Sequence, residues 1–366
     1  MKFSDVLDIR NGRNQRQVEN ENGKYPIYGS GGIMGRATDF ICDAGTVVIG
    51  RKGSINNPIF VDEPFWNVDT AFGLVAHRDV LLPKYLFYFC VNFDFERLNT
   101  TVTIPSLTKA NLLQIEINVP DMDEQRRVVS ILDKICQLID LQQQELHSLD
   151  QLVKSRFIEL FGEADGFESV PLNDSVDEMF IGPFGSSLKN ECFVVAEQGY
   201  CMVYEQKHAI KKTMDVDTRF VDEKKYKELR RFTVQGGDII VSCRGTIGET
   251  FIVPEDAPLG IMHPSIMKIR LKTAVYNRVF FNHLLQTVLN RHEADANGSG
   301  VKMAITATAL GKERFIRPPM ALQEQFAAFV EQTDKSKYYS SLSFRYCQAA
   351  ANTYRQEWMT CRTSDF

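Results

Sequence analysis

Two short segments of this chain combine side chains that suit phosphate groups and the edges of nucleic-acid bases. They are Arg51-Lys52-Gly53-Ser54 and Arg244-Gly245-Thr246, and each follows an apolar, strand-like run. Lysine and arginine neutralise phosphates or donate to guanine, a hydroxyl donates to phosphate oxygens, and glycine lets a backbone approach. Similar polar groups precede the last strand of each half: Ser106, Thr108 and Lys109, and then Ser299 and Lys302. Any one of these segments can equally be an ordinary polar turn, but their recurrence at matching places predicts a duplicated binding surface.

The order of these features is written twice along the chain. Gly45–Ile55 is followed by Val119-Pro120 and Glu124-Gln125, and a helical pattern begins there. Gly237–Ile247 is followed in the same way by Pro318-Pro319 and Glu324-Gln325. The period is too long for a solenoid repeat, whose units have about 20–50 residues. The sequence therefore predicts two copies of a whole domain with a connector, and double-stranded DNA is a ligand with two similar parts.

Each copy is expected to be a mixed unit of strands and helices. In the first copy, strand-like runs cover Thr46–Ile49, Ile59–Val61 and Phe72–Val75, and a helix is expected over Pro83–Asn92 with its proline in the first turn. The second copy has a matching helical pattern over Ala274–Leu289. It also has an insertion rich in charge, Asp215–Arg231, which is predicted to be a solvated surface excursion.

A long amphipathic helix is predicted after Glu124. Its apolar seam repeats every three or four residues: Val128, Leu132, Ile135, Ile139, Gln142, Leu146, Leu149, Val153, Phe157 and Leu160. About 38 residues at 1.5 Å each would give about 57 Å, which favours a coiled-coil connector that ends at Gly162. The final segment begins with Phe326, Phe329 and Val330 but keeps no continuous heptad, which predicts a helix that is short, divergent or truncated. The predicted domains are 1–121, 122–162, 163–319 and 320–366.

Length, composition and net charge limit the classes of protein to consider. The chain has 366 residues, of which 44% are hydrophobic and 24% charged, as in ordinary soluble proteins. No secretory signal and no apolar run long enough for a membrane is found, so the expected location is cytoplasmic. Its eight cysteines contain no C-x-x-C pair, which argues against zinc and disulfides. The net charge of −5 counts against nucleic-acid binding only in part, because binding depends on a local basic face.

No catalytic residues are predicted. The chain has no nucleotide-binding P-loop and no tetrapeptide typical of amino-methyltransferases. Gly29–Gly35 is better explained as a tight turn than as a phosphate-binding loop, because no strand and helix frame it in the required way. Cys243 beside Arg244 could be an activated thiol, but in an alternating strand a small core residue is the simpler interpretation.

In its ordered duplication the chain resembles a specificity subunit of a type I restriction–modification system. Tyr25–Arg36 and Ile181–Lys189 are similar to the openings of two target-recognition domains, and 120–125 and 319–325 are similar to the junctions into the connecting helices. The resemblance adds five candidate DNA-binding residues: Ser30, Arg36, Ser186, Ser187 and Lys189.

The resemblance implies an α/β (α+β) fold with two similar target-recognition domains separated by long antiparallel coiled-coil helices. It also implies that the domains read the two halves of a split DNA site and that the helices bind two modification subunits, joined by a restriction (translocase–nuclease) subunit. Such a chain has no active site and no cofactor of its own; S-adenosylmethionine, ATP and Mg are expected on the partner subunits. Two other functions stay open at this point, a protein–protein scaffold and a stand-alone hydrolase or nuclease.

Overall fold

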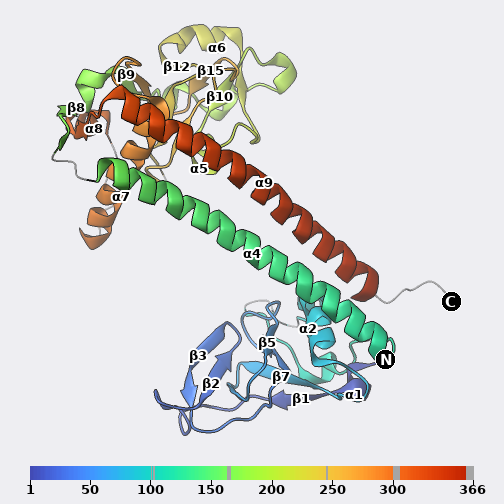
Figure 1. Ribbon diagram of the computed structural model, residues 1–366. Coiled ribbons are helices and arrows are strands. Elements are labelled where there is room, and N and C mark those ends of the chain that lie inside the picture. The colour runs from blue at the N-terminus through green and yellow to red at the C-terminus, as the bar shows by residue number, and fades with distance from the viewer. Residues whose placement is uncertain (100, 102–103, 163–165, 245, 300–305, 360–366) are drawn as a thin grey trace. The chain divides into compact units, whose positions relative to one another are not determined.

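The computed structural model describes residues 1–99, 101, 104–162, 166–244, 246–299 and 306–359, and for 291–299 and 359 it describes the backbone alone. The chain forms two compact units (Figure 1). The first contains Met1–His147 with Tyr338–Phe366, and the second contains Ser148–Lys337. Each unit holds one copy of the repeat, the start of one long helix and the end of the other, and each is described by itself.

The first repeat is built on a four-stranded antiparallel sheet. Its elements are α1 (Phe3–Val6), β1 (Leu7–Asn11), β2 (Tyr25–Gly29), β3 (Gly32–Ala37), β4 (Thr46–Gly50), β5 (Ile59–Val61), β6 (Trp66–Asn67), β7 (Ala71–Ala76), α2 (Pro83–Asn92) and α3 (Lys109–Leu112). The sheet order is β1-β7-β4-β5, with Ile9 opposite Leu74 and Val47 opposite Leu74 on the other side. A smaller sheet has the order β3-β2-β6. The strands and the helix α2 lie where the apolar runs predict them.

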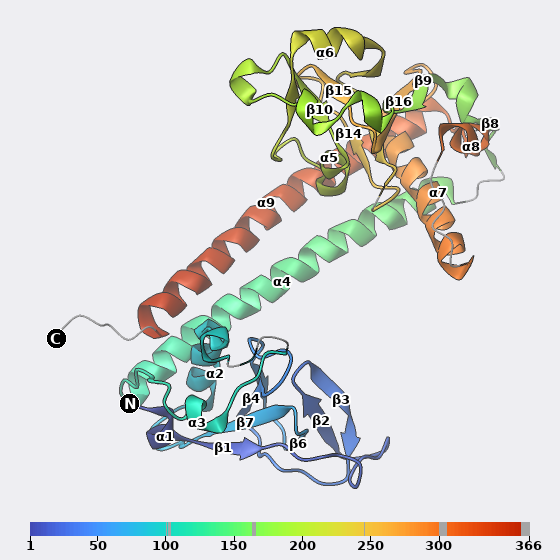
Figure 2. The same ribbon diagram turned by 180° about the vertical axis from the view of Figure 1, so that it is seen from behind.

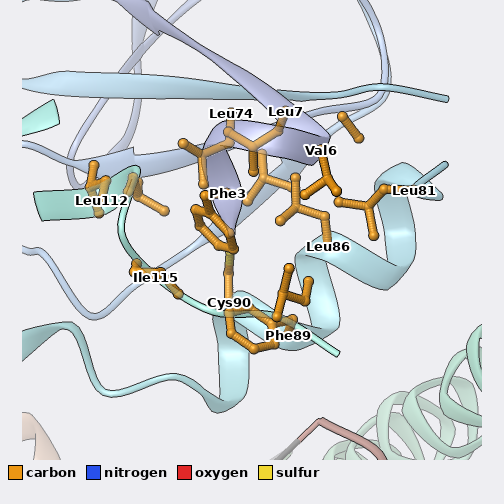
Figure 3. Packing of buried hydrophobic residues seen from close by; sticks show 14 of the residues in the cluster. Phe3, Val6, Leu7, Leu74, Leu81, Leu86, Phe89, Cys90, Leu112 and Ile115 are labelled. Atoms are coloured by element: carbon orange, nitrogen blue, oxygen red, sulfur yellow. The ribbon is translucent and has the colours of Figure 1, made fainter. Parts of the chain in front are cut away.

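Helix α2 covers one face of the larger sheet, as Figure 2 shows from behind. The alternating strands and one stripe of α2 supply the side chains buried between them. Figure 3 shows this packing, in which Phe3, Leu74, Leu86 and Phe89 are almost completely buried. The rings of Phe3 and Phe89 meet edge to face at 5.6 Å, a favourable geometry for an aromatic pair. The core therefore fixes the sheet whose strand ends form the candidate site below.

The second repeat has the same topology. Its elements are β8 (Ser169–Pro171), β9 (Val176–Ile181), β10 (Cys201–Tyr204), α5 (Gln206–Lys211), β11 (Phe220–Val221), α6 (Glu223–Glu228), β12 (Thr233–Val234), β13 (Ile239–Ser242), β14 (Thr250–Ile252), β15 (Gly260–Met262), β16 (Ile266–Leu271), α7 (Arg278–Ser299), α8 (Ala307–Lys312) and β17 (Arg314–Ile316). The sheet order β9-β16-β13-β14 repeats β1-β7-β4-β5, again with antiparallel neighbours. The predicted duplication is confirmed in the order of the strands.

The prediction of a solvated excursion over Asp215–Arg231 is wrong. The segment contains β11 and α6, and β11 belongs to the sheet β11-β10-β15-β12. Val221 is fully buried and Leu229 nearly so, in a small core of their own. The many charged residues hid these apolar anchors, because a short strand that pairs with a distant one leaves little periodicity in the sequence.

A network of ion pairs on the sheet β14-β13-β16-β9 combines the buried Lys268 and Asp238 with the partly exposed Glu178 and Arg270. Lys268 on β16 has a side chain that is 1% exposed, and its Nζ donates to Glu178 at 2.6 Å and to the carbonyl of Thr233 at 2.8 Å. Arg270 donates to both oxygens of Asp238, at 2.7 and 2.8 Å, and to Glu178 at 3.0 Å. Because Thr233 lies on β12, the network joins this sheet to the sheet β11-β10-β15-β12.

Helix α4 (Met122–Phe161) confirms the predicted seam. All ten seam residues are buried or half-buried, whereas Leu138, Leu141, Leu152 and Ile158 point outward. In the second unit, Phe157 and Phe161 pack on Phe326 and Phe280.

The prediction of a short, divergent or truncated last helix is wrong in its length. Helix α9 (Met320–Met359) has 40 residues, as many as α4. Its inward residues keep heptad spacing, but many are small or polar: Phe326, Val330, Thr333, Lys337, Ser340, Phe344, Cys347, Ala351, Tyr354 and Trp358. Ala351 and Ser340 are 2% and 9% exposed, so that small side chains let the helices approach. A hydrophobicity pattern does not detect such a seam.

The two long helices run antiparallel within each unit. In the first unit Gln142 donates to the hydroxyl of Ser343, and Arg355 donates to the sulfur of Cys136 at 4.0 Å. In the second unit Lys337 pairs with Asp150 at 2.8 Å. No helix in the described ranges is long and apolar enough to cross a membrane.

A buried glutamine fixes the start of each long helix, and its position corrects the predicted alignment of the two Glu-Gln pairs. Gln125 Oε1 accepts from the N–H of Leu82, and its Nε2 donates to the carbonyls of Val80 and Pro120, all within 2.9 Å. Gln323, not Gln325, makes the same contacts in the second repeat. Its Oε1 accepts from the N–H of Asn277 at 2.9 Å, and its Nε2 donates to the carbonyls of Val275 at 3.3 Å and Pro318 at 2.8 Å.

We expect Gln125→Met and Gln323→Met to destabilise their own units by about 2–3 kcal/mol each. Both side chains are almost fully buried, so the apolar replacement would leave buried backbone groups without partners. Urea unfolding checks this, with Gln143→Met on the exposed face of α4 as the control. Equal stability of Gln125→Met and Gln143→Met would contradict the structural role.

We expect the destabilisation caused by Glu178→Gln to be larger at pH 7 than at pH 3. The hydrogen bond from Lys268 lowers the pKa of Glu178 against the opposing effect of burial. A lowered pKa stabilises the fold above the unfolded value of about 4.3, and this stabilisation is lost as the pH falls through the folded pKa. Unfolding midpoints of both proteins between pH 3 and 7 test this; a constant difference would refute it. Glu228→Gln removes an exposed ion pair with Lys225 and serves as the control.

Candidate nucleic-acid interface

Three of the predicted segments meet where β4 ends in the first repeat. The backbones of Lys52 and Ser106 pair as an isolated antiparallel β-bridge. The carbonyl of Arg51 accepts from the N–H of Leu107 at 2.9 Å, and the N–H of Gly53 donates to the carbonyl of Pro105 at 3.0 Å. Gly53 has a φ of +86°, which glycine adopts without strain, and a side chain there would come within 3.7 Å of the hydroxyl of Ser30. Ser30, Lys52 and Ser106 thus lie together and form the first edge.

Lys52 is the basic side chain that this edge presents. It is exposed and has no ion pair among the described residues. Arg51 is half-buried instead, with its guanidinium over the ring of Phe72 at 5.7 Å and a long contact of 3.4 Å to the carbonyl of Asp69. The neighbouring cations therefore differ, one being directed outward and the other held against the sheet.

Three further predicted DNA-binding residues have internal partners. Arg36 donates to the carbonyls of Gly23 at 2.6 Å and Lys24 at 3.0 Å. Thr108 accepts from the N–H of Asn111 and caps α3, and Lys109 donates to the carbonyl of Ile9 at 2.9 Å. These contacts give all three a structural task, and their predicted contact with DNA stays a prediction.

The second repeat forms a corresponding edge from the ends of β9 and β13 and the start of β16. Gly182 donates to the carbonyl of Ile266 at 2.9 Å, and Cys243 donates to that of Ser265 at 2.9 Å. Arg244 and Thr246 follow, both exposed. Gly182, Arg244 and Ser265 define the second edge.

The segment after Gly182 carries three more predicted residues. Ser186 and Ser187 lie in a short 3-10 helix, Gly185–Ser187, and Lys189 is exposed just beyond it. Phe184 in the same segment is 87% exposed. Ser299 ends α7 and its side chain lies outside the described residues, as does the whole of Lys302.

The two edges can be superposed residue by residue through their backbone bonds. The N–H of Arg51 donates to Thr70 at 2.8 Å as that of Cys243 donates to Ser265 at 2.9 Å, so Lys52 and Arg244 occupy equivalent places. The sequence comparison of the two basic segments was therefore in register.

Tyr25–Arg36 and Ile181–Lys189, each similar to the opening of a target-recognition domain, occupy different places in the two repeats. A side chain at Gly12 would lie 1.8 Å from the carbonyl oxygen of Val68, and one at Gly182 would lie 2.2 Å from that of His263. Val68 and His263 are themselves equivalent, since the backbone N–H of each donates to the carbonyl of a tyrosine on the parallel neighbour strand, Tyr28 or Tyr204. Gly182 thus matches Gly12, and β2 matches β10. The two stretches therefore share glycine and serine content without sharing a place in the fold.

Two titratable groups lie at the second edge, Cys243 and His263. Burial raises the pKa of Cys243 to about 11, which keeps its thiol protonated despite the nearby Arg244. Burial also lowers the pKa of His263, whose Nδ1 lies 2.7 Å from the hydroxyl of Ser265. Within the described ranges no three His, Cys, Asp or Glu residues gather as a metal site would require.

A comparison with protein families decides the assignment. The model described as the type I restriction modification DNA specificity domain matches residues 1–151 and 201–338. The chain belongs to this type I specificity family. The first matched range includes the first edge and the second includes Arg244 and Ser265 of the second edge. The membership favours DNA recognition over a general protein scaffold or a stand-alone hydrolase.

Individual relatives agree with the family. Two Mycoplasma pneumoniae proteins assigned as type I specificity subunits are 26% identical over 139 residues and 24% identical over 146 residues. These matches cover 36% and 37% of this specificity chain and 74% and 48% of the relatives.

Two solved structures share the fold along nearly the whole chain. The type I S subunit from M. genitalium has a TM-score of 0.63 at 16% identity, with 99% of this chain and 96% of that one covered. A chain from a study of assembly and conformational transition of the type I R-M system has a TM-score of 0.58 at 15% identity, with 98% and 96% covered.

One group of residues beside the second edge is not predicted by any local sequence pattern. Glu205, Arg219 and His263 come from the ends of three paired strands, far apart in the chain. Aligning the two repeats on Tyr28 and Tyr204 would have placed Glu205 next to the edge.

We expect Gly12→Ala and Gly182→Ala to destabilise their repeats by about 1–3 kcal/mol, because each added methyl group would overlap a backbone carbonyl. Gly31→Ala and Gly185→Ala are matched controls, since nothing lies within 4 Å of the added carbon. Urea unfolding of the four variants measures the difference. Should Gly182→Ala be as stable as Gly185→Ala, the close approach of the strands would be disproved.

Proposed function

We propose that this chain recognises a bipartite site in double-stranded DNA, with each repeat contacting one half through its edge. The single observation that carries the proposal is the equivalence of Lys52 and Arg244, two exposed cations at the same place in a duplicated sheet. Family membership supports the same function. The hydroxyls of Ser30, Ser106 and Thr246 lie beside these cations or close to them in sequence and are suited to phosphate oxygens.

The proposal leaves the reaction to partner subunits. Two modification subunits would carry S-adenosylmethionine, a restriction subunit would carry ATP and Mg, and this chain would position them without a catalytic group or cofactor of its own. Exposed aromatic side chains on α9 support a docking role for the helices. Tyr338, Tyr339 and Tyr346 are 60%, 71% and 75% exposed, and tyrosine is enriched where proteins bind each other.

We expect Lys52→Ala and Arg244→Ala each to weaken binding of the assembled complex by about 1–3 kcal/mol, and each at one half-site only. The reason is that each cation belongs to a different copy of the edge. Binding is measured on cognate DNA and on DNA with either half-site scrambled. Once the half-site of the first repeat is scrambled, Lys52→Ala should cost nothing further.

Lys134→Ala removes an exposed lysine from α4 and should leave binding unchanged. Equal losses at both half-sites for Lys52→Ala would contradict the two-module proposal. A wild-type complex that binds random and cognate DNA alike would contradict sequence recognition itself.

A further inference from the structure

A cluster of charged side chains adjoins the second edge. Glu205 directly follows β10, Arg219 directly precedes β11, and His263 directly follows β15. Strand β10 pairs with β11 and β15. The backbone N–H of Val203 donates to the carbonyl of Arg219 at 2.9 Å, and the backbone N–H of His263 donates to the carbonyl of Tyr204 at 2.8 Å. The three residues therefore lie at one end of this sheet, and His263 leads within two residues to Ser265 of the second edge.

Glu205 holds two cations. Only 7% of the residue is exposed; Lys207 Nζ lies 2.8 Å from Oε2, and Arg219 Nη2 pairs with Oε1. Burial alone would raise the pKa of Glu205, but the hydrogen bonds from Arg219 and Lys207 outweigh it and the pKa is lowered. The carboxylate is therefore ionised at neutral pH, and the group of three side chains keeps one net positive charge.

Arg219 is held on a second side as well. Its guanidinium lies 4.0 Å from the centre of the Phe193 ring, within the range of a cation–π contact. A third of its side chain, 33%, remains exposed. A planar donor fixed by a carboxylate and an aromatic face has a set orientation, which a base edge demands and a phosphate does not.

The cluster and the second edge are close in space. His263 connects them: its backbone N–H donates to the carbonyl of Tyr204, the residue before Glu205, at 2.8 Å, and its Nδ1 lies 2.7 Å from the hydroxyl of Ser265 in the second edge. In the first repeat Gly29 and Val68 occupy the places of Glu205 and His263, so neither a carboxylate nor an imidazole stands at these two positions. The second repeat thus has an additional oriented cation.

We propose that Arg219 reads a guanine in the half-site bound by the second repeat and that Glu205 is the positioning residue which aims it. Guanine offers two acceptors, O6 and N7, on its major-groove edge, and the arginine fork matches both. Lys207, a mobile point charge on the same carboxylate, is assigned to a phosphate. This inference rests on the proposed function.

The test is binding-site selection from a randomised DNA library by the assembled complex. Wild type should require guanine at one position of the second half-site. Arg219→Ala should relax that position alone and weaken cognate binding about 10- to 100-fold. Arg219→Lys keeps the charge but lacks the fork, so it should relax the same position. Glu205→Gln should relax it more weakly, because the guanidinium remains but loses its charged partner.

Arg278→Ala is the matched control. Arg278 is 35% exposed and paired with Glu255, much as Arg219 is with Glu205, but it lies against Gly237 at the opposite end of β13 from Arg244. It should leave both affinity and selected sequence unchanged. Unfolding midpoints of all variants show whether any loss comes from folding, and Arg219→Lys provides the result if Arg219→Ala is unstable.

Two outcomes would overturn the inference. A uniform loss on all sequences, with a salt dependence reduced by about one phosphate, would place Arg219 on the DNA backbone. An unchanged selected sequence in Arg219→Ala would exclude any contact with a base. In both cases wild type still selects a bipartite sequence, whereas a wild type without selectivity would refute the proposed function instead.

Discussion

The structure depends on a buried glutamine side chain in each repeat, whose amide accepts a hydrogen bond from one backbone N–H and donates to two backbone carbonyls. Gln125 and Gln323 do so only when the first turn of the long helix lies against the loop that leads into α2 or α7. Since α2 covers the sheet that ends in the first edge, and α7 packs in the core of the matching sheet, the amide sets the position of each helix start relative to its own edge. An apolar residue could fill the same volume, but it could not select one rotation of the helix, because hydrophobic contact has no direction.

Apolar periodicity predicted the elements whose packing relies on large side chains. The strands β4, β5 and β7, helix α2 and the seam of α4 all bury valine, isoleucine, leucine or phenylalanine, and all were visible in the sequence. Helix α9 uses Thr333, Ser340 and Ala351 at the same heptad positions, where close approach replaces bulk. Serine and threonine are mostly exposed in proteins, so that their burial here follows only from the partner helix.

The sequence predicted the site residues that directly follow an apolar strand, but not those that are brought together by the pairing of distant strands. Lys52 and Arg244 come directly after apolar runs, and the repeat placed them in register. Glu205 and Arg219 owe their contact to the pairing of β10 with β11, which no local pattern specifies. Arg36, Thr108 and Lys109 have the right chemistry for DNA, but their partners are carbonyl and amide groups that the sequence alone does not bring near them.

An acidic chain can present oriented cations because part of its carboxylates form ion pairs with lysine and arginine side chains. Glu205 is paired with Lys207 and Arg219, and Glu178 and Asp238 with Lys268 and Arg270, so these carboxylates fix guanidinium and ammonium groups instead of repelling an anionic ligand. The net charge of −5 therefore says little about either edge. The first repeat has Gly29 where the second has Glu205. The first copy therefore presents Lys52 without a neighbouring carboxylate at this place, whereas in the second copy Glu205 orients Arg219. Two copies of a fold can in this way recognise unlike half-sites without any change in the strands that support them.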